Sequence, residues 1–260
     1  SDQGTPPVIT SEPVSHTDLN GDYALRNLPL AASSQLIFST DFNGAFPAQF
    51  TGVTTTESVQ GYSTVTNPNG PTFSGNFLRI PVGGIPTAQA TLTLTGLAPH
   101  TSISLAFLLA IIDTWDGSNS LGSPFDIFNV TVDGQSIFSS TFANLAGVGQ
   151  SYSPAVTGVD LTPGLTEIAF GATANVGDSA YNMALEPRFL NIPHTPTTLT
   201  IRWFASGPNI EVIVNESWAI DNVQVNLNGL TPPALNVVEA PPEGWRPTTG
   251  TTPVGAQLVG

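Results

Sequence analysis

The segment Ser102–Ile112 restricts the possible folds more than any other part of this chain. Its apolar residues occupy both alternating phases, Ile103, Leu105, Phe107 and Leu109 on one and Ala106, Leu108, Ala110 and Ile112 on the other. A strand with one face in water would keep one phase polar, so this pattern predicts burial on both faces. A buried helix is the competing interpretation, but the Ser-rich start and the β-branched end favour a strand at the centre of a sandwich.

Other segments of the chain also have the pattern of short strands. The clearest local signal is Asp133-Gly134, because these residues supply the positive φ angles of a tight hairpin turn between two apolar runs. The chain has 25 Gly and 23 Pro, a composition that favours strands joined by turns. We predict an all-β fold, a two-sheet β-sandwich of jelly-roll type, with these strands: Gln35–Thr40, Asn76–Pro81, Ala90–Thr95, Ser102–Ile112, Ile127–Val132, Ser136–Phe142, Leu165–Gly171, Thr198–Ala205, Ile210–Val214 and Trp218–Leu227.

The two ends of the chain differ from this body in composition. Residues 1–33 and 229–260 are Pro-rich and irregular, with Thr5-Pro6-Pro7 in the first and Pro241-Pro242 in the second. We therefore predict one β-sandwich domain, 34–228, with extended tails at 1–33 and 229–260.

Charge and cysteine content exclude several classes of function. The net charge is −14, with five Arg and no Lys, which argues against nucleic acid because phosphate binding needs clustered cations. No apolar stretch reaches the length of a membrane span. The chain has no Cys, which excludes disulfides and cysteine-based zinc sites. A start at Ser1 without Met is compatible with a removed signal peptide, and we expect a secreted or cell-surface protein.

The strongest candidate for a functional residue is Asp221, in Glu216-Ser-Trp-Ala-Ile-Asp221-Asn-Val. Asp221 shares its phase with Val223, Val225 and Leu227, so we expect it to face the core. A buried carboxylate needs a cation or several hydrogen-bond donors. Calcium binds carboxylate and carbonyl oxygens together, which makes structural calcium one interpretation of Asp221 and hydrogen bonds to turn amides the other.

Two further acidic segments lie at predicted strand ends. Asp113 and Asp116 follow the central strand, and Asp126 precedes the next one. Asp41 follows the first strand, in Ser39-Thr-Asp41-Phe-Asn43-Gly. Such residues fit an oxygen cage for calcium, although Asp113 and Asp116 fit a solvated loop equally well. The candidate metal ligands are Asp41, Asp113, Asp116, Asp126, Glu216 and Asp221.

These segments carry a family resemblance over about residues 38–228. Glu216-Ser-Trp-Ala-Ile-Asp221-Asn-Val resembles the closing strand of calcium-binding jelly-roll modules, such as reelin-type repeats and bacterial exported surface modules. The resemblance implies a structural calcium ion held by Asp41 and Asp221. The chain departs from reelin-type repeats in lacking Cys, and the two tails match no known pattern.

Two functions remain open. The first is a non-enzymatic structural protein that assembles into a filament, surface layer or matrix, with copies of itself as partners through the tails. The alternative is a carbohydrate-binding or adhesion module, for which Tyr62, Trp115, Tyr152, Tyr181 and Trp245 are the aromatic candidates; packing in the core is the other interpretation of Trp115 and Trp218. We expect no enzyme, because the three His are far apart in the sequence and no nucleophile motif occurs, although acidic residues from distant strands could converge.

Overall fold

The computed structural model describes residues 34–59, 73–81, 88–118, 126–144, 148–161, 178–207 and 216–230. All of them belong to one compact unit, Ser33–Leu230. The helices in this part of the chain are single 3₁₀ turns, η2 (Met183–Leu185) and η3 (Pro187–Phe189). None of the described helices has the length or the apolar run that crossing a membrane requires.

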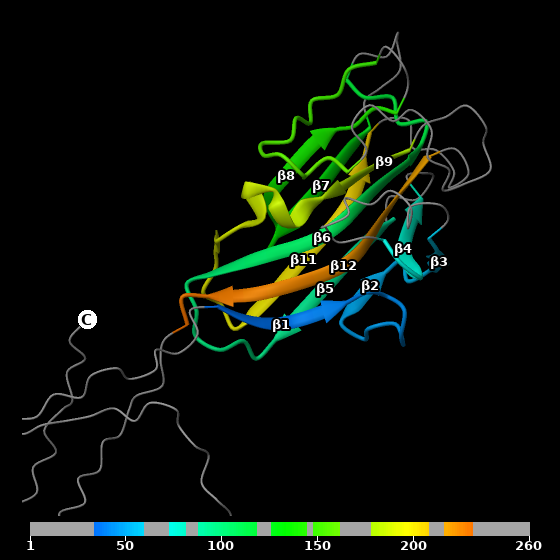
Figure 1. The fold of residues 1–260 in the computed structure, drawn as a ribbon. Coiled ribbons are helices and arrows are strands. Elements are labelled where there is room, and N and C mark those ends of the chain that lie inside the picture. Colours follow the sequence, from blue (N-terminus) through cyan, green and yellow to red (C-terminus); the bar gives the residue numbers. More distant parts are fainter. Residues whose placement is uncertain are drawn as a thin grey trace, which may run out of the picture. The chain divides into compact units, whose positions relative to one another are not determined.

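Two antiparallel sheets pack face to face in a β-sandwich of jelly-roll type, in which the chain crosses repeatedly from one sheet to the other (Figure 1). The larger sheet runs β10-β6-β12-β4-β3, with β1 also paired to β12 and β9 to β6. The smaller sheet runs β2-β5-β11-β7-β8. The strands are β1 (Ser34–Thr40), β2 (Phe50–Gly52), β3 (Thr56–Ser58), β4 (Asn76–Pro81), β5 (Gln89–Thr95), β6 (Ser102–Asp113), β7 (Ile127–Val132), β8 (Gln135–Thr141), β9 (Ser179–Asn182), β10 (Ile192–Pro193), β11 (Thr198–Ser206) and β12 (Glu216–Asn228).

The central strand β6 is buried on both faces, as its sequence predicts, and the reason is a second layer of side chains. One phase of β6 packs into the core between the sheets. The other phase lies under a smaller cluster on the outer face of the larger sheet, made of Phe73, Phe77, Leu108, Ala110, Ile112, Ala180 and Ala219. Every residue of β6 from Phe107 to Asp113 is therefore buried.

Aromatic side chains fill the core between the two sheets. Phe107 of the larger sheet meets Trp203 of the smaller one edge to face, with ring centroids 6.0 Å apart. Phe128 meets Trp218 in the same way at 5.1 Å. Such edge-to-face pairs add to the burial of apolar area and hold the sheets in one relative position.

The strand predictions hold wherever the structure describes the chain. The Asp133-Gly134 turn is also confirmed, since both residues have positive φ (48° and 81°) and Val132 pairs with Gln135 across the turn. The predicted strands Leu165–Gly171 and Ile210–Val214 lie outside the described residues, as do the predicted tail 1–33 and all of the predicted tail 229–260 except Gly229 and Leu230. The sequence did not indicate the short strands β2, β3, β9 and β10.

Candidate metal centres

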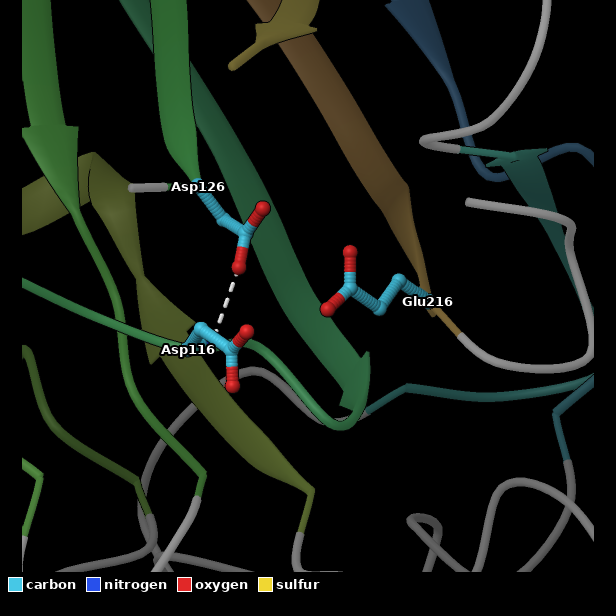
Figure 2. Close-up of side chains that lie close together, drawn as sticks. All are labelled: Asp116, Asp126 and Glu216. Carbon is cyan, nitrogen blue, oxygen red and sulfur yellow. Dashed lines mark hydrogen bonds between the residues drawn. The ribbon is translucent and has the colours of Figure 1, made fainter. Parts of the chain in front are cut away.

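Three of the predicted ligands, Asp116, Asp126 and Glu216, converge at one end of the sandwich (Figure 2). One carboxylate oxygen of each lies within 4.8 Å of the others. Asp126 and Glu216 are buried, and Asp116 is partly buried. The backbone N–H of Asp116 donates a hydrogen bond of 2.7 Å to Oδ2 of Asp126, which fixes these two residues together.

The three acids of this acidic triad come from both sheets. Glu216 is the first residue of β12 in the larger sheet, and Asp126 immediately precedes β7 in the smaller one. Asp116 lies in the loop that follows β6 and makes a single bridge with Ala143. A group bound to all three would therefore join the two sheets.

The charges of the acidic triad favour a bound cation. Three carboxylates this close repel one another, and burial makes the repulsion stronger than in water. A metal ion bound between the three carboxylates would remove this repulsion. Calcium takes six to eight oxygen ligands in flexible geometry, so three carboxylates with neighbouring carbonyls or water match its chemistry.

Asp113 does not belong to this triad, although the sequence predicts that it shares a cage with Asp116. Asp113 has a positive φ of 66°, which turns the chain at the end of β6. Its Oδ2 lies 3.6 Å from Nη2 of Arg79, and its N–H donates to Oδ1 of Asp178 at 2.7 Å. Burial raises the pKa of the Asp113 carboxyl, and the Arg79 charge opposes that rise.

Asp41 and Asp221 form a second acidic pair, at the other predicted site. The Asp221 carboxylate is fully buried and accepts the N–H of Asn222 at 2.7 Å and that of Ser74 at 3.4 Å. Burial raises the pKa of Asp221 to about 7; these two hydrogen bonds oppose the rise, and the nearby Asp41 carboxylate adds to it. The hydrogen bonds to backbone amides, one of the two interpretations of Asp221, are therefore present, and calcium binding by Asp221 stays a prediction.

The phase that Asp221 shares with Val223 suggests burial in the core between the sheets, but Asp221 is buried on the other face of the larger sheet. β12 has a bulge between Asp221 and Gln224, and Asn222 has a φ of 49°. The cross-strand partner of Asp221 is Leu108, which belongs to the outer cluster, so Asp221 faces the outer side of the larger sheet. The prediction that it points between the sheets is wrong.

Asn43 completes this second centre and was not among the predicted ligands. Its N–H and Nδ2 donate to the two oxygens of exposed Asp41, both at 3.1 Å, and these bonds lower the pKa of Asp41. Its Oδ1 accepts the N–H of Asn76 at 2.7 Å. An added Cβ on Gly75 would lie 1.8 Å from the same oxygen, so this close approach requires glycine. The signal in the sequence is the Asp-x-Asn spacing.

The aromatic candidates for sugar binding are buried wherever they can be placed. Trp115 is inaccessible, and its Nε1 donates to the carbonyl of Ser217 at 2.9 Å. Trp218, Tyr152 and Tyr181 are buried as well. Tyr62 and Trp245 lie outside the described residues. Core packing is therefore the role of Trp115 and Trp218.

A groove elsewhere on the sandwich is separate from both acidic centres. It has a volume of about 430 Å³ and is lined by residues of β1 and β5 and by the turn that follows β5, with Gln49 and Leu227. None of the six predicted ligands lines it.

Two of the three histidines are neighbours, which the sequence did not predict. His100 and His194 are both buried, and Nε2 of His100 lies 2.7 Å from Nδ1 of His194. Their separation in the sequence therefore does not keep these two histidines apart in the fold. No local pattern connects residues that are 94 positions apart.

Comparison with known proteins assigns no family. No family model matches the chain, and no curated protein matches it. A solved structure described as "Crystal structure of Agl-KA catalytic domain" aligns with 84% of this chain and 31% of its own, at 13% identity and a TM-score of 0.33. This chain thus spans about a third of that one, and a likeness so distant carries no argument about function.

Proposed function

We propose that this chain is a non-enzymatic structural protein of the cell exterior, a self-assembling subunit of a filament, surface layer or matrix whose β-sandwich is stabilised by calcium. The observation that carries the proposal is the acidic triad of Asp116, Asp126 and Glu216, which draws carboxylates from both sheets to within 4.8 Å of one another.

The acidic triad would act as a staple between the sheets. With no cation, the three charges push β12, β7 and the loop after β6 apart. With calcium bound, the same oxygens become ligands, and the repulsion becomes attraction. Because the unfolded chain cannot assemble the site, calcium would add to the free energy of unfolding by mass action. An extracellular setting, where calcium is abundant, suits such a device, because the calcium sites of extracellular modules typically have low affinity.

A catalytic role for the acidic triad has less support. Glycosidases need two carboxylates on either side of a sugar that enters an open cleft. Here Asp126 and Glu216 are each only 2% exposed, and the groove between β1 and β5 lies elsewhere. A buried acidic group is better suited to an ion than to a polymer substrate.

Self-assembly has support from the strand edges. In the described part of the chain, β8 pairs only with β7, and β1 pairs only with β12. An open edge offers unpaired N–H and C=O groups that an extended segment of another copy can pair with. The glycan-binding alternative is weaker, because Trp115, Tyr152 and Tyr181 are buried and cannot serve as platforms.

Electron microscopy and light scattering of the full chain test this function, in calcium and then in chelator. We expect ordered polymers in calcium. A chain that stays monomeric in calcium and binds members of a glycan panel would replace this proposal with the adhesion module. Turnover of a glycan or ester that one carboxylate substitution abolishes would contradict the non-enzymatic role.

A further inference from the structure

A chain of three hydrogen bonds runs through the buried histidine pair. Nδ1 of His100 lies 2.6 Å from the carbonyl oxygen of Ala98. Nε2 of His100 lies 2.7 Å from Nδ1 of His194, and Nε2 of His194 lies 3.0 Å from Oδ2 of Asp133. The ring centroids are 5.0 Å apart and the planes are inclined by 17°, so the rings meet edge to edge along this hydrogen bond.

The number of protons that these three hydrogen bonds require determines the net charge of the histidine pair. A carbonyl oxygen only accepts, so Nδ1 of His100 must carry a proton. An ionised carboxylate also only accepts, so Nε2 of His194 must carry one. The bond between the rings needs one proton more, on either nitrogen. Three protons on four ring nitrogens give the pair a single positive charge, opposite the negative charge of Asp133.

The chain of bonds connects parts of the sandwich that are far apart in sequence. His100 lies in the turn between β5 and β6, His194 follows β10, and Asp133 begins the β7–β8 turn. Oδ1 of Asp133 also accepts the N–H of Thr200 in β11 at 2.8 Å, a bond within the smaller sheet. The bond from His194, which follows β10, connects this turn to the larger sheet.

The same end of the sandwich holds the ends of β1 and β12. The N–H of His194 donates to the carbonyl of Thr101, and the N–H of Thr101 donates to the carbonyl of Asn228. Asn228 in turn pairs with Ser34, the first residue of β1. Among the described residues in these hydrogen bonds to the histidine pair, Asp133 has a charged side chain, and Ala98 and Thr101 are neutral.

We propose that His100, His194 and Asp133 form a clasp that holds one excess proton near neutral pH and opens in acid. Binding of a second proton places two charged rings in contact and removes the acceptor from the bond between them. The clasp then loses the connection between the β5–β6 turn and the β7–β8 turn, and the strand ends at Thr101 and Asn228 loosen with it. The clasp depends neither on the calcium centres nor on self-assembly.

Nitrogen NMR of the imidazole rings in the full chain, recorded from pH 4 to pH 9, tests the clasp. A short histidine-containing peptide, measured under the same conditions, is the reference for an ordinary histidine. We expect three of the four ring nitrogens of the pair to carry protons at pH 7, with the single charge retained while the reference peptide loses its own. Two neutral rings at pH 7, or a pair that gains and loses protons together with the reference peptide, would overturn the proposal.

Amide exchange gives a second readout in the same protein. Between pH 7 and pH 4 we expect the protection factors of Thr101 and His194 to drop roughly tenfold, the effect of losing about one hydrogen bond. His100→Gln should remove this drop, whereas His16→Gln should leave it unchanged. If the His100→Gln variant does not fold, the protonation pattern of the rings in the native chain is the test of the clasp. Unchanged protection in acid would contradict opening of the clasp.

Discussion

Asp221 shows how burial of a single carboxyl makes stability depend on pH. Its pKa in the folded chain is about 7, whereas an Asp in an unfolded chain titrates at about 4. Between these values the folded chain binds a proton that the unfolded chain does not. The contribution of Asp221 to the stability of the calcium-free protein should therefore be fully present below about pH 4 and be lost as the pH rises through about 7. Calcium, by binding the charged form, should reduce this loss.

The substitution Asp221→Asn tests this directly, because it keeps the size of the side chain and removes the charge. In chelator at pH 8, we expect it to raise the free energy of unfolding by up to about 4 kcal/mol, the equivalent of three pH units. At pH 5 the gain should be much smaller. Urea unfolding at the two pH values measures both, and equal stability of variant and native chain at pH 8 would contradict the burial argument.

Glu216 is the corresponding test residue in the acidic triad. Glu216→Gln removes one of three charges that face the bound ion, so calcium affinity should fall roughly tenfold or more. Calorimetric titration of calcium into the chain measures the loss. Glu239→Gln is a matched control, with the same chemical change outside the described sandwich, and it should bind calcium as the native chain does. If the Glu216 variant binds calcium as tightly as the native chain does, the acidic triad is not a calcium site.

At this scale, the sequence indicated which acidic residues are candidate ligands but not how they group. Strand-end positions were sufficient to name Asp116, Asp126 and Glu216. Their meeting depends on the packing of two sheets, which no local pattern shows. Asp113 was grouped wrongly because a positive φ at the end of β6 directs it to Arg79. The pairing of His100 with His194 is likewise a tertiary contact.

At the scale of strands, β12 shows what an alternating pattern can and cannot reveal. Its core residues have even numbers up to Ile220 and odd numbers from Val223 onward. A bulge at this point accounts for the change of phase, and it places Asp221 and Asn222 where the strand leaves its regular path. The change of phase is visible in the sequence, so a bulge could have been predicted there.

The β7–β8 turn allows a backbone prediction free of packing effects. Gly134 has a φ of +81°, and a Cβ added to it would meet no atom within 4 Å. Gly134→Ala should therefore destabilise the chain by about 1–2 kcal/mol through backbone strain alone. Gly44 has equally open surroundings without a positive φ, so Gly44→Ala should have little effect. Thermal unfolding measures the stability of both variants. If Gly134→Ala is as stable as Gly44→Ala, the positive φ at Gly134 is contradicted.

Long strands were predictable because their pattern reports burial. β6 is apolar on both phases, and β12 alternates on each side of its bulge; both patterns indicate burial. The short strands β2, β3, β9 and β10 have two to four residues, too few for a pattern to develop. They form because the neighbouring strands offer an edge to pair with, which is a property of the fold and not of the segment.

For the whole molecule, the fold class followed from the pattern of strands, whereas assembly remains a proposal. We propose that the Pro-rich segments 1–33 and 229–260 join copies of the chain by pairing with an open strand edge. Deletion of residues 1–33 should therefore leave the melting temperature of the sandwich nearly unchanged and prevent polymer formation. Electron microscopy beside calorimetry separates the two effects, and polymers identical to those of the full chain would exclude a role for this segment.

The central claim is that calcium is part of the folded protein, and the melting temperature in calcium and in chelator tests it most directly. At a calcium concentration a few hundred times the dissociation constant, the gain in stability is roughly 3–4 kcal/mol. For a domain of this size, that corresponds to a rise of roughly 10 °C. We predict such a rise by differential scanning calorimetry of the full chain at pH 7.5, reduced in Glu216→Gln and in Asp221→Asn. The same melting temperature in calcium and in chelator would contradict the account.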